Sequence, residues 1–140
     1  MTLLLKLKPQ ALSGLIATVP RMKSASLVAT DVGSIVYLWL VDGETERSAL
    51  HGVSTLEAFE AITIPQERDP SKRKDAFRLT LSQAVTEILA PLSMDDLTPY
   101  RFVEGGDGLE SLGRIHRDRN DKIIRLAPGE AGALAARFRN

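Results

Sequence analysis

A continuous run of seven apolar residues, Ile35 to Val41 with the sequence IVYLWLV, constrains the fold of this chain more than any other stretch. β-branched and aromatic side chains dominate the run, and Asp42-Gly43, a frequent hairpin pair, follows it. An apolar run of this length that ends at turn residues is typical of a strand buried on both faces. Trp39, the only tryptophan, lies within it. We therefore expect this strand at the centre of a sheet, with helices packed on it.

The composition indicates one folded domain over residues 1–140. Hydrophobic residues make up 44% of the chain and charged residues 26%, as in ordinary globular proteins. The chain has no cysteine, which excludes disulfides, thiolate catalysis and cysteine-based zinc sites. The N-terminal residues lack a basic leader and a long apolar segment, so we expect no signal peptide, and no window is apolar enough to span a membrane. A cytoplasmic protein is the resulting expectation.

The expected elements mix hairpins with helices, which favours the α+β class. The sheet is expected to be mainly antiparallel, with about five strands around the strand 35–41. Three of its strands would form a meander, namely 26–30, 35–41 and 44–50. The other expected strands cover residues 2–8, 76–81, 100–103 and 122–126, and the expected helices cover 11–19, 54–62, 82–90 and a segment that starts at Pro128.

Several of these elements depend on short local patterns. Ser54 and Glu57 match a capping box at the start of the helix 54–62, and residues 65–75 are polar enough for an exposed loop. In the strand 2–8, leucines alternate with Lys6 and Lys8, which favours a half-buried edge strand. One continuous helix over 76–90 remains an alternative to the strand and helix expected there.

The residue types that usually carry catalysis are sparse. Neither His51 nor His116 lies in a HExxH motif, and no serine lies in a GxSxG elbow. The paired carboxylates Asp95-Asp96 occur in a capping context rather than an apolar pocket that would raise a pKa. The glycine-rich loop 104–113 lacks the lysine of a phosphate-binding loop, and its acidic residues would repel phosphate. We therefore expect no catalytic residue, no metal site and no cofactor.

Charge is balanced overall but unevenly placed. Eighteen basic and eighteen acidic residues give a formal net charge of zero. Residues 42–70 nevertheless hold seven acidic and two basic side chains, whereas residues 114–140 hold seven basic and three acidic ones. An acidic middle and a basic C-terminal part can present two different surfaces. Because the chain has no global field, any binding to a polyanion must be local.

A basic cluster near the C-terminus is the most informative feature for function. Lysine and arginine neutralise phosphates, and arginine also binds guanine edges. If residues 114–125 form a hairpin that turns at Asn120-Asp121, three of the arginines share one face. A second basic group, Lys72, Arg73, Lys74 and Arg78, could join the cluster in space. The cluster itself consists of Arg114, Arg117, Arg119, Lys122 and Arg125.

These observations favour a non-catalytic binding protein, and its most specific form is a nucleic-acid-binding accessory factor that uses the basic hairpin. Aromatic side chains suited to base stacking are scarce, and those present are expected to be buried. The alternative is a protein–protein adaptor or inhibitor that uses the acidic edge of the meander and the helix 54–62. The basic cluster could also be a solvated surface that binds no partner. An enzyme is less favoured, and the oligomeric state and the identity of the partner are not fixed by the sequence.

Overall fold

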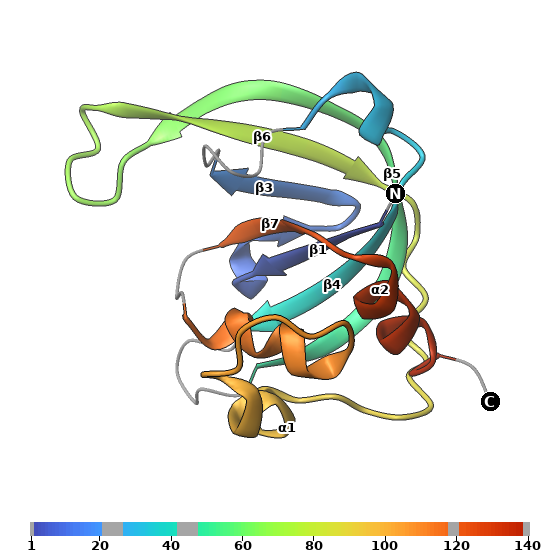
Figure 1. Ribbon diagram of the computed structural model, residues 1–140. Coiled ribbons are helices and arrows are strands. Elements are labelled where there is room, and N and C mark those ends of the chain that lie inside the picture. Colours follow the sequence, from blue (N-terminus) through green and yellow to red (C-terminus); the bar gives the residue numbers. More distant parts are fainter. Residues whose placement is uncertain (1, 21–26, 42–47, 118–120, 139–140) are drawn as a thin grey trace.

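The strands of this chain pair into one curled sheet of seven strands, in the order β2-β3-β6-β5-β4-β1-β7 (Figure 1). β1 and β4 run parallel, and the other neighbouring strands run antiparallel. The computed structural model describes residues 2–20, 27–41, 48–117 and 121–138, apart from the side chains of His116 and Arg117. The strands are β1 (Thr2–Leu7), β2 (Leu12–Ser13), β3 (Ile16–Pro20), β4 (Ile35–Val41), β5 (Ser48–Pro65), β6 (Arg73–Leu81) and β7 (Lys122–Arg125).

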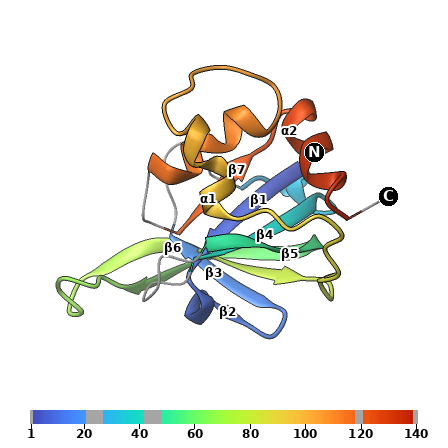
Figure 2. The same cartoon turned by 90° about the horizontal axis from the view of Figure 1, so that it is seen from below.

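Short helices cover one side of this sheet, over the outer face of β1, β4 and β7 (Figures 1 and 2). The α+β class is confirmed, but the sheet is mixed and has seven strands, so the expected antiparallel sheet of about five strands is wrong. No helix in the described part of the chain has the length and apolar character to cross a membrane. The α-helices are α1 (Met94–Leu97) and α2 (Pro128–Ala135), and the 3-10 helices are η1 (Pro9–Ala11), η2 (Ala29–Asp31), η3 (Thr98–Tyr100) and η4 (Leu109–Arg117).

Two apolar clusters hold the sheet, one on each face, and β4 contributes to both. Val36 and Leu38 lie in the inner cluster, whereas Tyr37 and Trp39 lie in the outer one, as the two-residue period of a strand requires. The sheet curls far enough for β3 to contact β7, which encloses the inner cluster. The strand expected at 35–41 is therefore confirmed, and Trp39 is fully buried.

β1 is an interior strand, so the prediction of an edge strand at 2–8 is wrong. It lies between β4 and β7, and residues 3–7 are all buried. Its outer face packs under η4, where the Lys6 ammonium donates to the backbone oxygen of Ile115 at 2.7 Å. Lysine indicates an exposed face only where nothing packs on that face. Here a segment 109 residues further along the chain covers it.

Residues 54–62 belong to β5, so the predicted helix there is wrong. The Ser54 hydroxyl donates to the backbone oxygen of Ser82 at 2.6 Å instead of capping a helix. A β-bulge between Leu56 and Ala58 inserts one extra residue opposite β6. The bulge brings Leu56 and Phe59 to the same face of the sheet, although residues three apart on a regular strand point to opposite faces. Because of the bulge, apolar residues three positions apart share one face, and this is the spacing that suggested a helix.

The predicted helix at 11–19 is also wrong, because the chain turns back on itself there. Gly14 has a φ of +59°, a left-handed conformation that glycine adopts without steric cost. It allows the hairpin between β2 and β3, in which Ser13 pairs with Ile16. The apolar residues that suggested a helical stripe are thus spread over η1, two short strands and the turn between them, and Val19 packs in the inner cluster.

Three further expectations fail for related reasons. Residues 82–90 are extended rather than helical, because the Val85 backbone exchanges two hydrogen bonds with Val53, at 2.8 and 3.0 Å. Residues 98–100 form η3, and no strand follows at 100–103. Residues 27–30 do not form a strand, so the expected meander is reduced to the antiparallel pair β4–β5. Its Asp42-Gly43 turn and residues 44–47 lie outside the described residues.

The helix expected from Pro128 is confirmed as α2, and the strand expected at 122–126 is confirmed as β7. Leu134 of α2 is fully buried in the outer cluster. The core of the strand expected at 76–81 is confirmed as the C-terminal part of β6, which begins at Arg73. The exposed loop expected at 65–75 is therefore shorter, and only residues 66–72 connect β5 to β6.

Candidate functional site

The basic residues from 114 to 125 do not form a hairpin, so that prediction is wrong. Arg114 lies in the middle of η4 and the backbone of Arg117 ends it, while Lys122 and Arg125 begin and end β7. Because the backbone of residue 117 is helical, the strand alternation from which a shared face was inferred does not apply at that residue. Arg119 lies outside the described residues.

Arg125 forms a partly buried ion pair with Asp31, far from it in sequence. Its guanidinium donates from Nη1 to Oδ1 at 2.6 Å and from Nη2 to Oδ2 at 2.7 Å, a bidentate arrangement. The Asp31 carboxylate is fully buried, and 34% of the Arg125 side chain is exposed. The hydrogen bond from Arg125 lowers the pKa of Asp31 below its ordinary value, although burial opposes this. Arg125 is thus a structural residue that joins β7 to η2.

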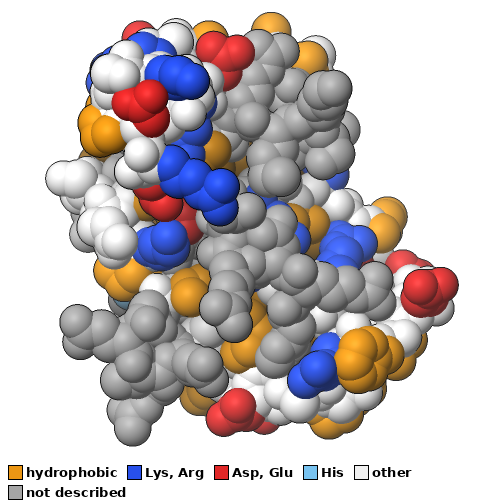
Figure 3. Space-filling view, turned by 90° about the vertical axis from the view of Figure 1, so that its left-hand side faces the viewer, with side chains coloured by type: hydrophobic (Ala, Val, Ile, Leu, Met, Phe, Trp, Pro, Cys, Tyr) orange, Lys and Arg blue, Asp and Glu red, His pale blue; other side chains and the backbone are white. Residues whose placement is uncertain are grey.

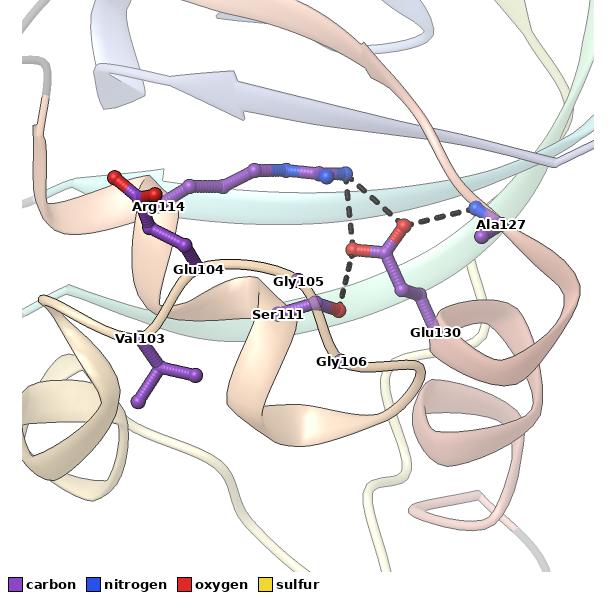
Figure 4. Close-up of a pocket in the computed structure, with 8 residues that line it drawn as sticks. All are labelled: Val103, Glu104, Gly105, Gly106, Ser111, Arg114, Ala127 and Glu130. Carbon is purple, nitrogen blue, oxygen red and sulfur yellow. Dashed lines mark hydrogen bonds and ion pairs between the residues drawn. The ribbon is translucent and has the colours of Figure 1, made fainter.

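Arg114 also pairs with a buried carboxylate, at the edge of a cavity of about 360 Å³. Its Nη2 lies 2.9 Å from Oε2 of Glu130, which also accepts the Ser111 hydroxyl at 2.9 Å (Figure 4). The backbone N–H of Ala127 donates to the other oxygen of Glu130 at 2.8 Å. The remaining walls of the cavity come from the loop residues Val103, Glu104, Gly105 and Gly106.

The Arg114 guanidinium keeps unused donor atoms beside this cavity. All its contacts with the described residues use Nη2, so Nε and Nη1 have no partner in that part of the chain. Glu130, by contrast, has each oxygen bonded at least twice, which makes it a structural anchor rather than an acid or base. The cavity therefore offers hydrogen-bond donors to an uncharged acceptor, while Glu104 disfavours an anion there.

The glycine-rich loop packs against the start of α2. Glu110 Oε1 accepts the backbone N–H of Asp107 at 3.1 Å. Hydrogen bonds from backbone N–H groups, first its own and then that of Asp107, hold the pKa of Glu110 below its ordinary value. A Cβ added at Gly129 would lie 1.8 Å from the backbone oxygen of Asp107, so loop and helix touch at a point where only glycine fits.

This contact gives a sharp stability test. Gly129→Ala should lower the free energy of unfolding by about 1–3 kcal/mol, because the loop or the helix must move apart to admit the methyl group. Gly132→Ala in the same helix is the matched control. A Cβ there meets no atom within 4 Å, so the substitution should be neutral or stabilise by up to about 1 kcal/mol. Equal urea midpoints for the two variants would contradict the close approach.

The second predicted basic group lies on the β5–β6 hairpin, which projects from the sheet (Figures 1 and 2). Lys72 is exposed in the hairpin turn, and Lys74 is half-buried. The Arg73 guanidinium donates a hydrogen bond to the Thr63 backbone oxygen at 2.6 Å. Arg78, further along β6, forms an exposed ion pair with Glu60.

The hairpin turn and the start of β7 lie at the same end of the sheet. Burial raises the pKa of Asp121, and the backbone N–H of Lys8, which donates to it at 3.0 Å, opposes this. The charge of Glu67, in the hairpin turn, raises that pKa further, so the turn lies within electrostatic range of Asp121. We call this region the basic end and define it by Lys8, Lys72, Lys74 and Lys122.

The view onto this side of the molecule shows Lys and Arg side chains in several places, interspersed with Asp and Glu side chains (Figure 3). The surface is therefore mixed in charge rather than uniformly basic. Some of these cations are already paired with carboxylates, as Arg78 is with Glu60. The β5–β6 turn, with Lys72, lies toward the same end of the sheet as the start of β7, with Lys122. Arg114 and Arg125 form ion pairs with buried carboxylates.

One exposed aromatic residue escaped the sequence analysis. The Phe102 side chain is 80% exposed, and the Arg101 guanidinium lies over its ring, 4.5 Å from the centroid. The stretch Tyr100 to Val103 was expected to be a strand, and the aromatic side chains of the chain were expected to be buried. The signal that could have found it is an arginine and an aromatic residue directly before a glycine-rich loop.

Residues 2–20, 27–41, 48–117 and 121–138 contain no metal-binding constellation. These residues contain no group of three or more histidine, aspartate or glutamate side chains that could hold a metal ion. A second cavity, of about 260 Å³, is lined by Tyr37, Val53, Phe138 and the hydroxyls of Ser54 and Ser82. Its lining includes no acidic, basic or histidine residue, and its two serine hydroxyls hydrogen-bond to each other at 3.0 Å.

Solved structures with the same fold are known. The chain is similar to the DUF55 domain of human thymocyte nuclear protein 1, with a TM-score of 0.59, 14% identity and full coverage of both chains. It is similar to an ASCH protein from Zymomonas mobilis, with a TM-score of 0.56 and 13% identity over 99% of this chain and 96% of that one. A third similar structure is the human THYN1 protein in complex with DNA that contains 5-methylcytosine, with a TM-score of 0.54 and 11% identity over 99% and 98% of the two chains.

At these identities the similarity shows a shared fold and nothing finer. No family model matches the sequence, and no curated protein is significantly similar to it.

Proposed function

We propose that the protein is a non-catalytic nucleic-acid-binding protein that contacts the phosphate backbone with its basic end. The observation that carries the proposal is that two basic segments, about fifty residues apart in sequence, lie toward the same end of the sheet (Figures 1 and 2). Lys72 and Lys74 come from the β5–β6 hairpin, and Lys122 begins β7. The THYN1 complex adds support, because a protein of the same fold has been crystallised with DNA.

The proposed contact set differs from the one that the sequence suggested. Arg125 and Arg114 are left out because buried carboxylates hold them, and withdrawing either cation would leave a buried charge unpaired. Arg73 is left out because it donates to Thr63 within the hairpin. Arg117 and Arg119 stay in the set on the sequence alone.

Salt dependence provides the test. If about four cations contact phosphates on a duplex, the observed affinity should fall with salt with a log–log slope of about −3 to −4. The double variant Lys72→Ala/Lys74→Ala should make that slope shallower by about two units. The measurement is a titration of labelled duplex and single-stranded oligonucleotides at several salt concentrations, with circular dichroism to check the fold. Arg117→Ala/Arg119→Ala tests the remaining part of the set in the same way.

Arg137→Ala is the matched control, because it also removes a cation but lies at the end of α2, away from the basic end in both ribbon views (Figures 1 and 2). Its slope should equal that of the wild type. An equal loss in this control, or no binding at the lowest salt, would contradict the proposal. The remaining alternative would then be a protein partner, contacted through β5 instead of the helix expected at 54–62.

A further inference from the structure

Phe102 is an aromatic side chain that the described part of the chain leaves largely exposed. Its 80% exposure exceeds that of the other exposed large apolar residues among those described, which range from 38% to 55%. Single exposed apolar side chains are common on proteins. Phe102 differs because the Arg101 guanidinium lies 4.5 Å from its ring centroid, in the geometry of a cation–π contact. The ring and the guanidinium together form a flat surface that does not pack against the hydrophobic core.

We propose that Phe102, with Arg101 beside it, is a stacking site for an unpaired base of single-stranded nucleic acid. This inference rests on the proposed function and adds the substrate class. Every base has a π face, so an exposed phenyl ring can stack on it without regard to sequence. The guanidinium can stack on a neighbouring base or pair with its phosphate. A base inside a duplex has both faces covered by its neighbours, and the ring cannot reach it.

The position of this site fits the path of a strand that starts at the basic end. In both ribbon views the start of β7 lies between the hairpin turn, on one side of the molecule, and the loop after α1 and η3, on the other (Figures 1 and 2), so a single strand must pass the start of β7 to reach both. The Arg114 cavity begins at the next residue, Val103. The Nε and Nη1 donors of Arg114, which have no partner among the described residues, therefore lie beside the same loop, where they suit the carbonyl and ring-nitrogen acceptors of a base.

The charges around the loop favour a base over a phosphate at this site. Glu104 and Asp107 are exposed there, and they would repel a phosphodiester placed directly on the loop. An uncharged base is not repelled, so the strand would place its phosphates on Lys72, Lys74 and Lys122 and direct a base toward Phe102. A protein partner that buries Phe102 as an anchor is the competing explanation.

The test compares single-stranded and duplex oligonucleotides of equal length with three variants. Phe102→Ala should weaken single-strand binding about tenfold and change duplex binding by less than about twofold. Phe102→Trp should retain single-strand binding, and its exposed indole emission should be quenched when the single strand is added. Leu89→Ala is the matched control, since it removes another exposed apolar side chain, 55% exposed, and it should change neither affinity.

The outcomes separate this inference from the proposed function. If Phe102→Ala binds single strands like the wild type while Lys72→Ala/Lys74→Ala binds them less well, base stacking is wrong and the nucleic-acid function stands. Equal losses for single strands and duplexes, or an unquenched indole in Phe102→Trp, also overturn the stacking site. If the wild type binds no oligonucleotide at low salt, both proposals are wrong, and a protein partner that buries Phe102 becomes the better explanation.

Discussion

Replacing Trp39 with alanine should lower the free energy of unfolding by about 3–5 kcal/mol, the largest loss expected for any single substitution in this chain. Trp39 is fully buried in the outer cluster, which joins β1 and β4 to α1, η4 and α2. Its indole N–H donates to the hydroxyl of Ser48, at the start of β5. The alanine variant therefore leaves a cavity between the sheet and its helical cover, and it also leaves a buried hydroxyl without its partner.

Urea unfolding measures this loss, and Ile35→Ala on the same strand is the control. Ile35 is 47% exposed, so its truncation should cost less than about 1 kcal/mol. As the only tryptophan, Trp39 should also give the native protein the blue-shifted emission of a buried indole. Emission typical of water-exposed tryptophan, or equal losses for the two variants, would overturn the assignment of β4 to the centre of two cores.

The elements that the sequence predicted correctly are those set by their own side chains. β4 is apolar throughout, as expected for a strand in the middle of a sheet, and its residues 36–39 are buried. α2 begins at Pro128, where proline has no N–H to lose and a suitable φ, and its apolar residues repeat at helical spacing. In both cases the residues of the element itself were sufficient to predict it.

The elements that were missed depend on distant parts of the chain or on one irregular residue. β1 carries Lys6 but is an interior strand because β7, more than a hundred residues later, pairs along it, and η4 covers its outer face. The bulge between Leu56 and Ala58 of β5 gave its apolar residues a helical spacing. A hydrophobic pattern read along the sequence contains neither the covering segment nor the inserted residue, so it favoured an edge strand and a helix.

The same limitation applies to the candidate site. The sequence located the cations, but it could not show which of them are neutralised internally. Arg125 pairs with an aspartate 94 residues away, and Arg114 pairs with Glu130 across the turn into α2. Both therefore looked available in the sequence. Phe102 was missed for the opposite reason, because aromatic residues are usually buried and its exposure depends on an irregular loop.

Removing the arginine of the Asp31–Arg125 pair should be the second most damaging change. Arg125→Met leaves the fully buried Asp31 carboxylate with the backbone N–H of Val28 but without its cation. Breaking a buried ion pair in this way costs about 3–5 kcal/mol. We expect about 3 kcal/mol at neutral pH, because a third of the Arg125 side chain is exposed and solvent screens part of the interaction.

The pH dependence identifies the carboxylate as the cause. In the wild type the pKa of Asp31 is lower in the folded state than in the unfolded chain, where it is about 3.9. The pair therefore stabilises the fold fully above that unfolded value, and the stabilisation is lost as pH falls through it toward the folded pKa. In Arg125→Met the cation that lowers the pKa is gone and burial raises it, so the sign reverses. That variant should regain stability, relative to the wild type, as the pH falls below about 5.

A double-mutant cycle separates the pair from the packing of its side chains. Asp31→Asn/Arg125→Met removes the buried charge together with its partner, and replacing both members of a buried pair is often nearly neutral. The double variant should therefore be more stable at neutral pH than Arg125→Met alone, and its stability should lack the acid transition of the wild type. If the two variants unfold at the same urea concentration and show the same pH profile, the loss comes from the packing of the Arg125 side chain between β7 and η2. Arg125 would then be free to contact a phosphate without cost to a buried carboxylate, and it would return to the set of candidate nucleic-acid contacts.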